Sequence, residues 1–203
     1  MTETDLRPLA PAPTHAFTTA ATTAPGLRVL SHARWPETDD DTFPQIAGFI
    51  VSSFNPLVAE VADRCLRRRP GSPPAAADES SGTDAPPNRT ALLLASGGGD
   101  RATARAIAEA VAAGRRVPPL LFFQSNPNAV LGHIAARWRL AGPVVSISPL
   151  RDGAPGVPAE ALAEADLLLR DGDADQVLVI AAEQDDGPGG RDRAEAVLVD
   201  HGP

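Results

Sequence analysis

Four histidines and one cysteine are the residues of this sequence best suited to acid–base or nucleophilic chemistry. No two of the histidines, His15, His32, His133 and His201, have the spacing of a metal-ligand pair. Cys65 is the single cysteine, so the chain can form neither an internal disulfide nor a cysteine-rich zinc site. The chain has no lysine, which excludes a lysine Schiff base and a P-loop lysine. We therefore expect no metal and no cofactor.

Two further segments carry groups that could bind a ligand or act as nucleophiles. Residues 97–100 read Gly-Gly-Gly-Asp after an apolar run, and a glycine turn before a helix can hold a phosphate. The segment fits neither dinucleotide-binding nor P-loop spacing, and Asp100 would repel an anion, so we interpret it as a turn with a helix cap. Ser146 and Ser148 alternate with apolar residues, and no nucleophile-elbow motif surrounds them, so we expect them to pack on one face of a strand.

The bulk properties limit the partners that the protein can have. The chain has 203 residues, 43% of them hydrophobic, which suits one globular domain. Its net charge of −8 argues against nucleic acid and anionic membranes as partners. The amino terminus lacks the basic and apolar regions of a signal peptide, and no apolar run has the length of a membrane span. We expect a cytoplasmic protein.

The elements that must position these residues follow from the apolar pattern. Residues 1–26 and 70–88 are low in complexity, and we predict a flexible tail and a disordered loop there. Between them, residues 27–200 form one domain. The pattern predicts strands at 27–32, 90–96, 143–148, 176–181 and 194–199, helices at 55–69, 100–113, 126–142 and 158–170, and an extended apolar segment at 119–123. This β-α-β-α-β-α-β-β order predicts an α/β fold, a mixed five-stranded sheet with helices on both faces.

That order, together with local motifs, resembles the N-terminal half of the β-ketoacyl synthase, or thiolase-like, fold. Residues 118–148 read PPLLFFQSNPNAVLGHIAARWRLAGPVVSIS. Asn128, Gly132 and His133 match the family's N-x-x-x-G-H helix, and Gly142 with Pro143 matches its Gly-Pro turn. Residues 171–183 resemble the family's unit of helix, G-x-A-D turn, strand and acid. Within this resemblance His133 belongs to a packing helix.

Two departures from the family affect the expected function. Where the family has its nucleophilic cysteine, counted from Pro143, this sequence has Arg151, which stays protonated and cannot act as a nucleophile. The family's two catalytic histidines lie in its C-terminal half, and this sequence ends after the first half. The chain therefore resembles a truncated chain length factor, the inactive partner of a ketosynthase, and we expect no catalytic activity from it alone.

The resemblance also implies the chain's partners and its functional surfaces. The partner is a full-length ketosynthase with an intact cysteine, through which an acyl carrier protein could be reached. The expected pocket-lining residues are Phe122, Phe123, Asn126 and Trp138, although the aromatic ones could equally be core. The expected interface is an uncharged edge strand made of Pro143, Val144, Val145, Ser146, Ile147 and Ser148. Half of a two-layered fold should also leave an apolar face exposed.

Two other functions are compatible with the sequence. One is a small thiolase-like acyltransferase or hydrolase that uses Ser146, Ser148 or His133. The other is an α/β protein that binds a small molecule at residues 97–100.

Overall fold

The computed structural model describes residues 26–69, 89–149, 156–185 and 191–202. The predicted tail at 1–26, apart from Gly26, and the predicted loop at 70–88 lie outside these residues, so both stay predictions. The helices and strands are β1 (Leu27–Trp35), α1 (Phe54–Arg67), β2 (Thr90–Ala95), α2 (Arg101–Ala112), α3 (Pro119–Ser125), α4 (Pro127–Trp138), β3 (Val144–Ile147), α5 (Ala159–Arg170), β4 (Gln176–Glu183) and β5 (Arg193–His201).

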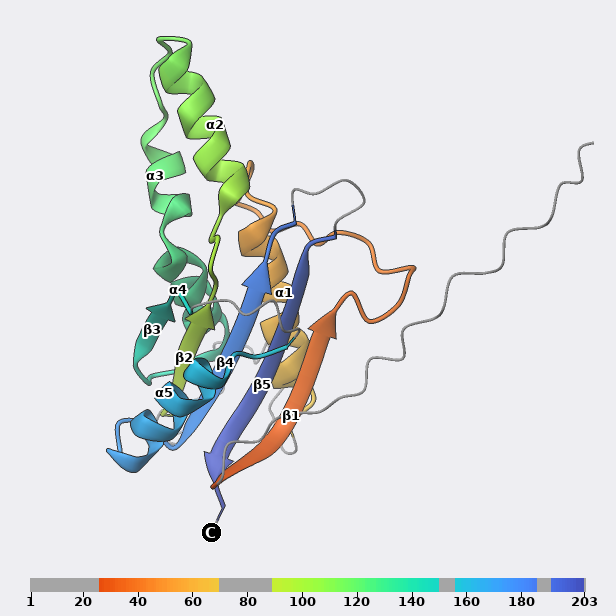
Figure 1. Ribbon diagram of the computed structural model, residues 1–203, viewed down its shortest axis with the longest axis vertical. Coiled ribbons are helices and arrows are strands. Elements are labelled where there is room, and N and C mark those ends of the chain that lie inside the picture. The colour runs from red at the N-terminus through yellow and green to blue at the C-terminus, as the bar shows by residue number, and fades with distance from the viewer. Residues whose placement is uncertain (1–25, 70–88, 150–155, 186–190, 203) are drawn as a thin grey trace, which may run out of the picture.

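The five strands form one mixed sheet in the order β1-β5-β4-β2-β3, as Figure 1 shows. β2 pairs in parallel with β3 and with β4, whereas β5 runs antiparallel to β4 and to β1. The mixed five-stranded α/β sheet predicted from the sequence is confirmed. This order leaves β3 and β1 as the two edges of the sheet.

β2 lies in the middle of the molecule, and all six of its side chains are buried. Leu92 and Leu94 join the core that α1 and α4 cover, while Ala91, Leu93 and Ala95 join the core under α5. Successive side chains of a strand point to opposite faces, so a strand between two helical layers must be apolar at every position. The continuous apolar run at residues 90–96 therefore follows from burial on both faces.

The main difference from the sequence prediction is at residues 119–123, which are helical rather than extended. α3 begins with Pro119 at its first position, where the ring fixes a helical φ and the missing N–H costs nothing. A short apolar run has no periodicity that distinguishes a buried strand from a helix, so the pattern did not reveal this turn of helix.

The following helix also ends earlier than residue 142. Arg139 adopts a left-handed conformation with φ of 52°, and its N–H is directed at the carbonyls of Ala135 and Ala136. This cap ends α4 at Trp138 and frees residues 139–143 to turn into β3.

Gly142 fixes where β3 starts, because the chain passes directly against β2 at this point. A Cβ atom added to Gly142 would lie 2.5 Å from the carbonyl oxygen of Thr90 and from the amide nitrogen of Ala91. Both contacts are with backbone, which cannot rotate away as a side chain could. The closeness of this approach requires glycine.

We expect Gly142→Ala to lower the free energy of unfolding by about 1–3 kcal/mol, because the added methyl group forces β2 and the start of β3 apart. Gly132→Ala is the matched control. An added Cβ at Gly132 meets nothing within 4 Å, and alanine should raise helix stability there by up to ~1 kcal/mol. Urea unfolding of both variants measures the difference, and equal stabilities would show that the close approach does not constrain the fold.

Candidate functional site

The expected interface strand is the edge strand β3. Within the described residues its only pairing is with β2, reinforced where Leu92 N donates to the Pro143 carbonyl at 2.8 Å and Ser96 N donates to the Ile147 carbonyl at 3.1 Å. Val144 and Ser146 are exposed on the α4 side, and Val145 and Ile147 pack against the core under α5. No strand of the part of the chain that the structure describes pairs with the other edge of β3.

The two edges of the sheet differ in their protection against pairing with another chain. β1 has an irregularity in its register between Val29 and Ser31 and carries Arg28 and Arg34. Bulges and charged side chains are the features by which proteins prevent edge-to-edge association. β3 has neither feature, so it is the edge that remains suited to strand pairing.

The carboxyl ends of β2 and β3 border a small cavity of about 200 Å³. The glycine turn at 97–99 and residues 146–148 form opposite sides of it, with Phe54 and Pro127 completing the lining. Ser146 is anchored to the first turn of α4, because its Oγ donates to Asn128 Oδ1 at 3.1 Å. In open α/β sheets ligands commonly bind at this end of the strands.

The backbone N–H groups of the glycine turn already donate hydrogen bonds to side chains of the protein itself. Glu183, the last residue of β4, accepts from Gly97 N at 2.6 Å and from Gly98 N at 3.3 Å. Gln184 Oε1 accepts from the first two amides of α2, and the side chain of Asp100 accepts from Thr103 N at 3.0 Å. The turn therefore already holds a carboxylate where a phosphate would bind, which disfavours the small-molecule binding alternative.

The four expected pocket-lining residues divide into two groups. Phe122 and Phe123 are 61% and 72% exposed on α3, so the interpretation of these two as core residues is wrong for this chain. Asn126 follows them directly and caps α4, accepting from Asn128 N at 2.9 Å. Trp138 lies at the far end of α4, where its indole N–H donates to Asp63 Oδ1 at 3.1 Å. The structure thus brings Phe122, Phe123 and Asn126 together and places Trp138 apart.

The histidines and the cysteine take structural positions. His133 is half-buried on α4 and lies edge-on to Phe49 with ring centroids 6.2 Å apart. His32 pairs with Glu195, and His201 pairs with Asp166. Burial raises the pKa of the Cys65 thiol to about 11, so the thiolate that a nucleophile needs is scarce at neutral pH.

Across the described ranges, no group of three or more His, Cys, Asp or Glu residues could hold a metal ion. Arg151 lies outside the described residues. None of the helices described is long and apolar enough to cross a lipid bilayer.

Sequence reasoning missed a buried polar cluster beside the cavity. The Asn55 amide donates to Asp100 Oδ2 at 3.1 Å and to the Gln124 carbonyl at 2.9 Å, which joins the starts of α1 and α2 to the end of α3. All three residues are buried. Because they stand far apart in the sequence, no local motif marks them; only the fold brings them together.

If Glu183 fills the glycine turn as described, removing its carboxylate should open the turn to anions. We expect phosphate to raise the melting temperature of Glu183→Ala more than that of the wild type, because the amides of Gly97 and Gly98 become available. Thermal unfolding with increasing phosphate measures this. An equal rise for both proteins would mean that the carboxylate does not block the turn.

Comparisons with known proteins were made for sequence and for structure. No curated protein matches the sequence. The family model described as "Beta-ketoacyl synthase, N-terminal domain" matches residues 55–188.

Several solved structures share the fold. One similar chain comes from the ketosynthase ApeO in complex with its chain length factor ApeC from Xenorhabdus doucetiae, with 15% identity, a TM-score of 0.61, and coverage of 87% of this chain and 79% of that one. The ishigamide ketosynthase/chain length factor gives 19% identity and a TM-score of 0.58, covering 81% of this chain and 48% of that one. AntDE:AntF, a type II polyketide synthase acyl-carrier protein in complex with its ketosynthase, gives 12% identity, a TM-score of 0.53, and coverage of 86% and 62%.

This chain therefore spans about half the length of the ishigamide protein and most of the length of the matched Xenorhabdus chain. At these identities the similarity establishes the fold, a thiolase-like α/β domain. With the family model matching most of the chain, the protein belongs to the β-ketoacyl synthase family, in which it corresponds to the N-terminal domain.

Proposed function

We propose that this protein is a non-catalytic ketosynthase-like subunit of the chain length factor type. It pairs with an active, cysteine-containing ketosynthase and shapes the pocket that receives the growing acyl chain in polyketide, polyene or fatty-acid-like biosynthesis. The observation that carries the proposal is the open, uncharged edge of β3, in a fold similar to that of chains from ketosynthase/chain length factor complexes. An acyl carrier protein would be reached through the ketosynthase.

The absence of a suitable nucleophile supports a non-catalytic role. Arg151 stands at the position that the family resemblance gives to the catalytic cysteine, and a guanidinium cannot attack a thioester. The single cysteine, Cys65, is fully buried under the sheet on α1. The family match covers the N-terminal domain only, whereas the family's catalytic histidines belong to its C-terminal half.

Strand pairing across β3 is the proposed mode of association. An extended strand that adds to an open edge gains main-chain hydrogen bonds, and exposed side chains on the two faces supply specificity. Val144 and Ser146 are available on one face of β3 for this purpose. The seam would include the flanking Pro143 and Ser148.

The acyl pocket is proposed to be completed by α3 and the start of α4. Phe122 and Phe123 expose large apolar side chains, and Asn126 stands beside them at the cap of α4. In a pair of subunits these side chains could line an apolar tunnel whose depth sets the length of the chain that fits. Trp138 would contribute only indirectly, by fixing α4 against α1 through Asp63.

The alternative of a stand-alone acyltransferase or hydrolase has less support. The hydroxyl of Ser146 donates to Asn128, and within the described residues no hydrogen bond joins Ser146 or Ser148 to a histidine. A serine nucleophile needs a base within hydrogen-bond reach.

We expect the purified chain to release no carbon dioxide from malonyl carrier protein above background, and Arg151→Cys to restore none, because the family match covers an N-terminal domain and the family's catalytic histidines belong to its C-terminal half. The active ketosynthase partner in the same assay is the positive control. Clear turnover by Arg151→Cys would mean that the chain holds a complete catalytic site and would remove the case for a non-catalytic subunit.

A charge placed on the β3 edge should weaken the pairing. Val144→Lys puts an ammonium in the proposed seam, which should cost about 2–5 kcal/mol of binding if the charge is buried without a partner. Val29→Lys is a matched control, since Val29 is 39% exposed on the opposite edge strand and Val144 is 40% exposed. Co-purification with a co-expressed, cysteine-containing ketosynthase measures the effect, and complex formation by Val144→Lys at the wild-type level would exclude β3 as the seam.

A further inference from the structure

A second cavity lies where the chain leaves β1 and enters β5, at the edge of the sheet opposite β3 (Figure 1). Its volume is about 440 Å³, against about 200 Å³ for the cavity beside the glycine turn. Pockets for small organic ligands have volumes of about 300–1,000 Å³, so the second cavity is large enough for one. Trp35 stands opposite Ala194 in the register of β1 and β5, which brings the residues after Trp35 and those before Ala194 together as its walls.

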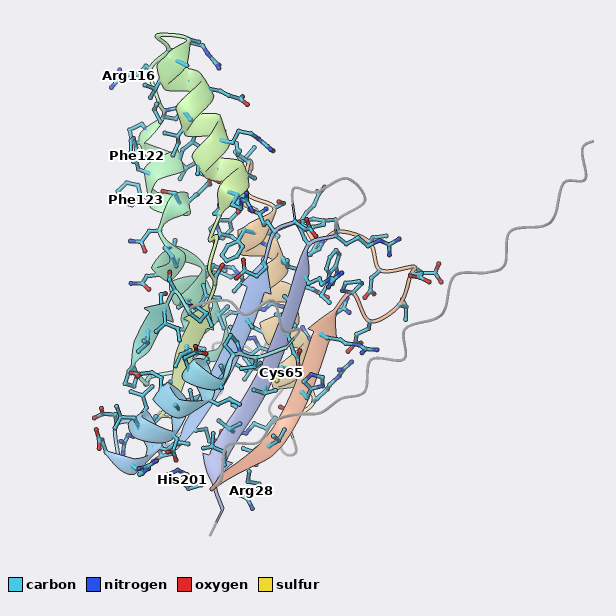
Figure 2. All side chains as sticks on the ribbon, in the orientation of Figure 1. Arg28, Cys65, Arg116, Phe122, Phe123 and His201 are labelled. Carbon is cyan, nitrogen blue, oxygen red and sulfur yellow. The ribbon has the colours of Figure 1, made fainter. Side chains whose placement is uncertain are left out.

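Two aromatic side chains form the apolar part of the wall. The rings of Trp35 and Phe43 meet nearly at right angles, with an interplanar angle of 75° and centroids 5.3 Å apart. Trp35 belongs to the core that α1 covers, whereas Phe43 is half-exposed. Aromatic rings carry negative potential on their faces and attract a cation placed over them. This pair of rings is therefore suited to an ammonium group. Figure 2 shows all the described side chains in the same orientation.

The polar part of the wall is acidic. The carboxylates of Asp39, Asp41 and Asp192 line the cavity together with one guanidinium, that of Arg191. Arg64 pairs with Asp41, with 3.0 Å between Nη1 and Oδ2. The pair between Arg191 and Asp39, at 3.4 Å, is weak because both side chains are exposed. Within the described ranges no cationic side chain pairs with Asp192, which accepts only from a backbone amide and a hydroxyl. The cavity thus offers a carboxylate to a cation from outside the chain.

Trp35 also has a hydrogen-bond donor that no acceptor among the described residues satisfies. Its side chain is buried, and its indole N–H has no partner. The indole N–H of Trp138, by contrast, donates to Asp63. A buried donor without an acceptor costs free energy, and an acceptor on a bound molecule would remove that cost. The ligand that fits this wall therefore carries a hydrogen-bond acceptor as well as a cation.

We propose that this cavity binds a small ammonium compound that also carries a hydroxyl or carboxylate oxygen. The ammonium group lies between the aromatic rings and Asp192, and the oxygen accepts from the indole N–H of Trp35. The site is independent of the proposed pairing with a ketosynthase, since β1 and β3 are opposite edges of the sheet. Its test therefore needs no partner protein.

The indole N–H signals in proton–nitrogen NMR spectra of the full chain test the proposal, because the chain has two tryptophans and Trp138→Phe assigns them. The probe is choline, a quaternary ammonium compound with a hydroxyl group. Choline should shift the Trp35 signal until it saturates, with a dissociation constant on the order of 1 mM, and leave the Trp138 signal in place. The uncharged isostere of choline, in which a tert-butyl group replaces trimethylammonium, should bind at least about tenfold more weakly.

Two carboxylate variants locate the site. Asp192→Asn should bind choline about tenfold more weakly, because the charge is lost while the remaining oxygen can still accept from Asp185 N. Asp173→Asn is the matched control, since Asp173 is exposed in the turn before β4, at the other end of the sheet, and it should bind choline as the wild type does.

Several results would overturn the proposal. In the wild type these are a Trp35 signal that does not respond saturably to choline, equal binding of the isostere, or a Trp138 shift as large as that of Trp35. Wild-type affinity in Asp192→Asn, or an equal loss in Asp173→Asn, would also overturn it. The comparison of choline with its isostere uses the wild type alone, so it decides the point even if Asp192→Asn does not fold.

Discussion

The burial of β2 on both faces is the constraint on which the remaining structure depends. Its six side chains divide between two cores, so helices must cover both sides of the sheet. Its parallel pairings with β4 and β3 then require crossover connections, and these carry α2, α3 and α4 to their positions. The connection to β3 must also pass directly over β2, which only Gly142 permits. The position of β3 at the edge, the positions of α2 and α3, and the cavity at the carboxyl ends of the strands all depend on this central strand.

The exposed large apolar side chains of the described residues are spread over several elements, so the single apolar face expected for half of a two-layered fold stays a prediction. α5 buries Ala161, Leu162 and Ala165, and its outer face exposes the apolar Leu167, at 48%, beside Glu160 and Arg170. Of the ten exposed large hydrophobic side chains among the described residues, four lie on α2 and α3, and three, Phe43, Ile50 and Val51, lie in the segment between β1 and α1.

The sequence was sufficient for the architecture but not for the arrangement of the site. Continuous apolar runs at β2 and β4 and periodic runs at α1 and α5 depend on local burial patterns, which the sequence records. α3 was not predicted as a helix, because a short apolar run has no periodicity that distinguishes a helix from a buried strand. The carboxylate of Glu183 in the glycine turn and the cluster of Asn55, Asp100 and Gln124 were also not predictable, since each joins residues far apart along the chain.

The central claim is that a ketosynthase subunit covers β3 and, at the proposed acyl pocket, α3. Hydrogen exchange of the backbone amides, measured for this chain alone and in the presence of the ketosynthase, tests it most directly. The account predicts that residues 119–125 and 144–147 become strongly protected in the complex, because strand pairing and enclosure remove them from water, while β1 exchanges at the same rate in both states. Protection confined to β1, or no change at β3 when the two proteins are mixed, would contradict it.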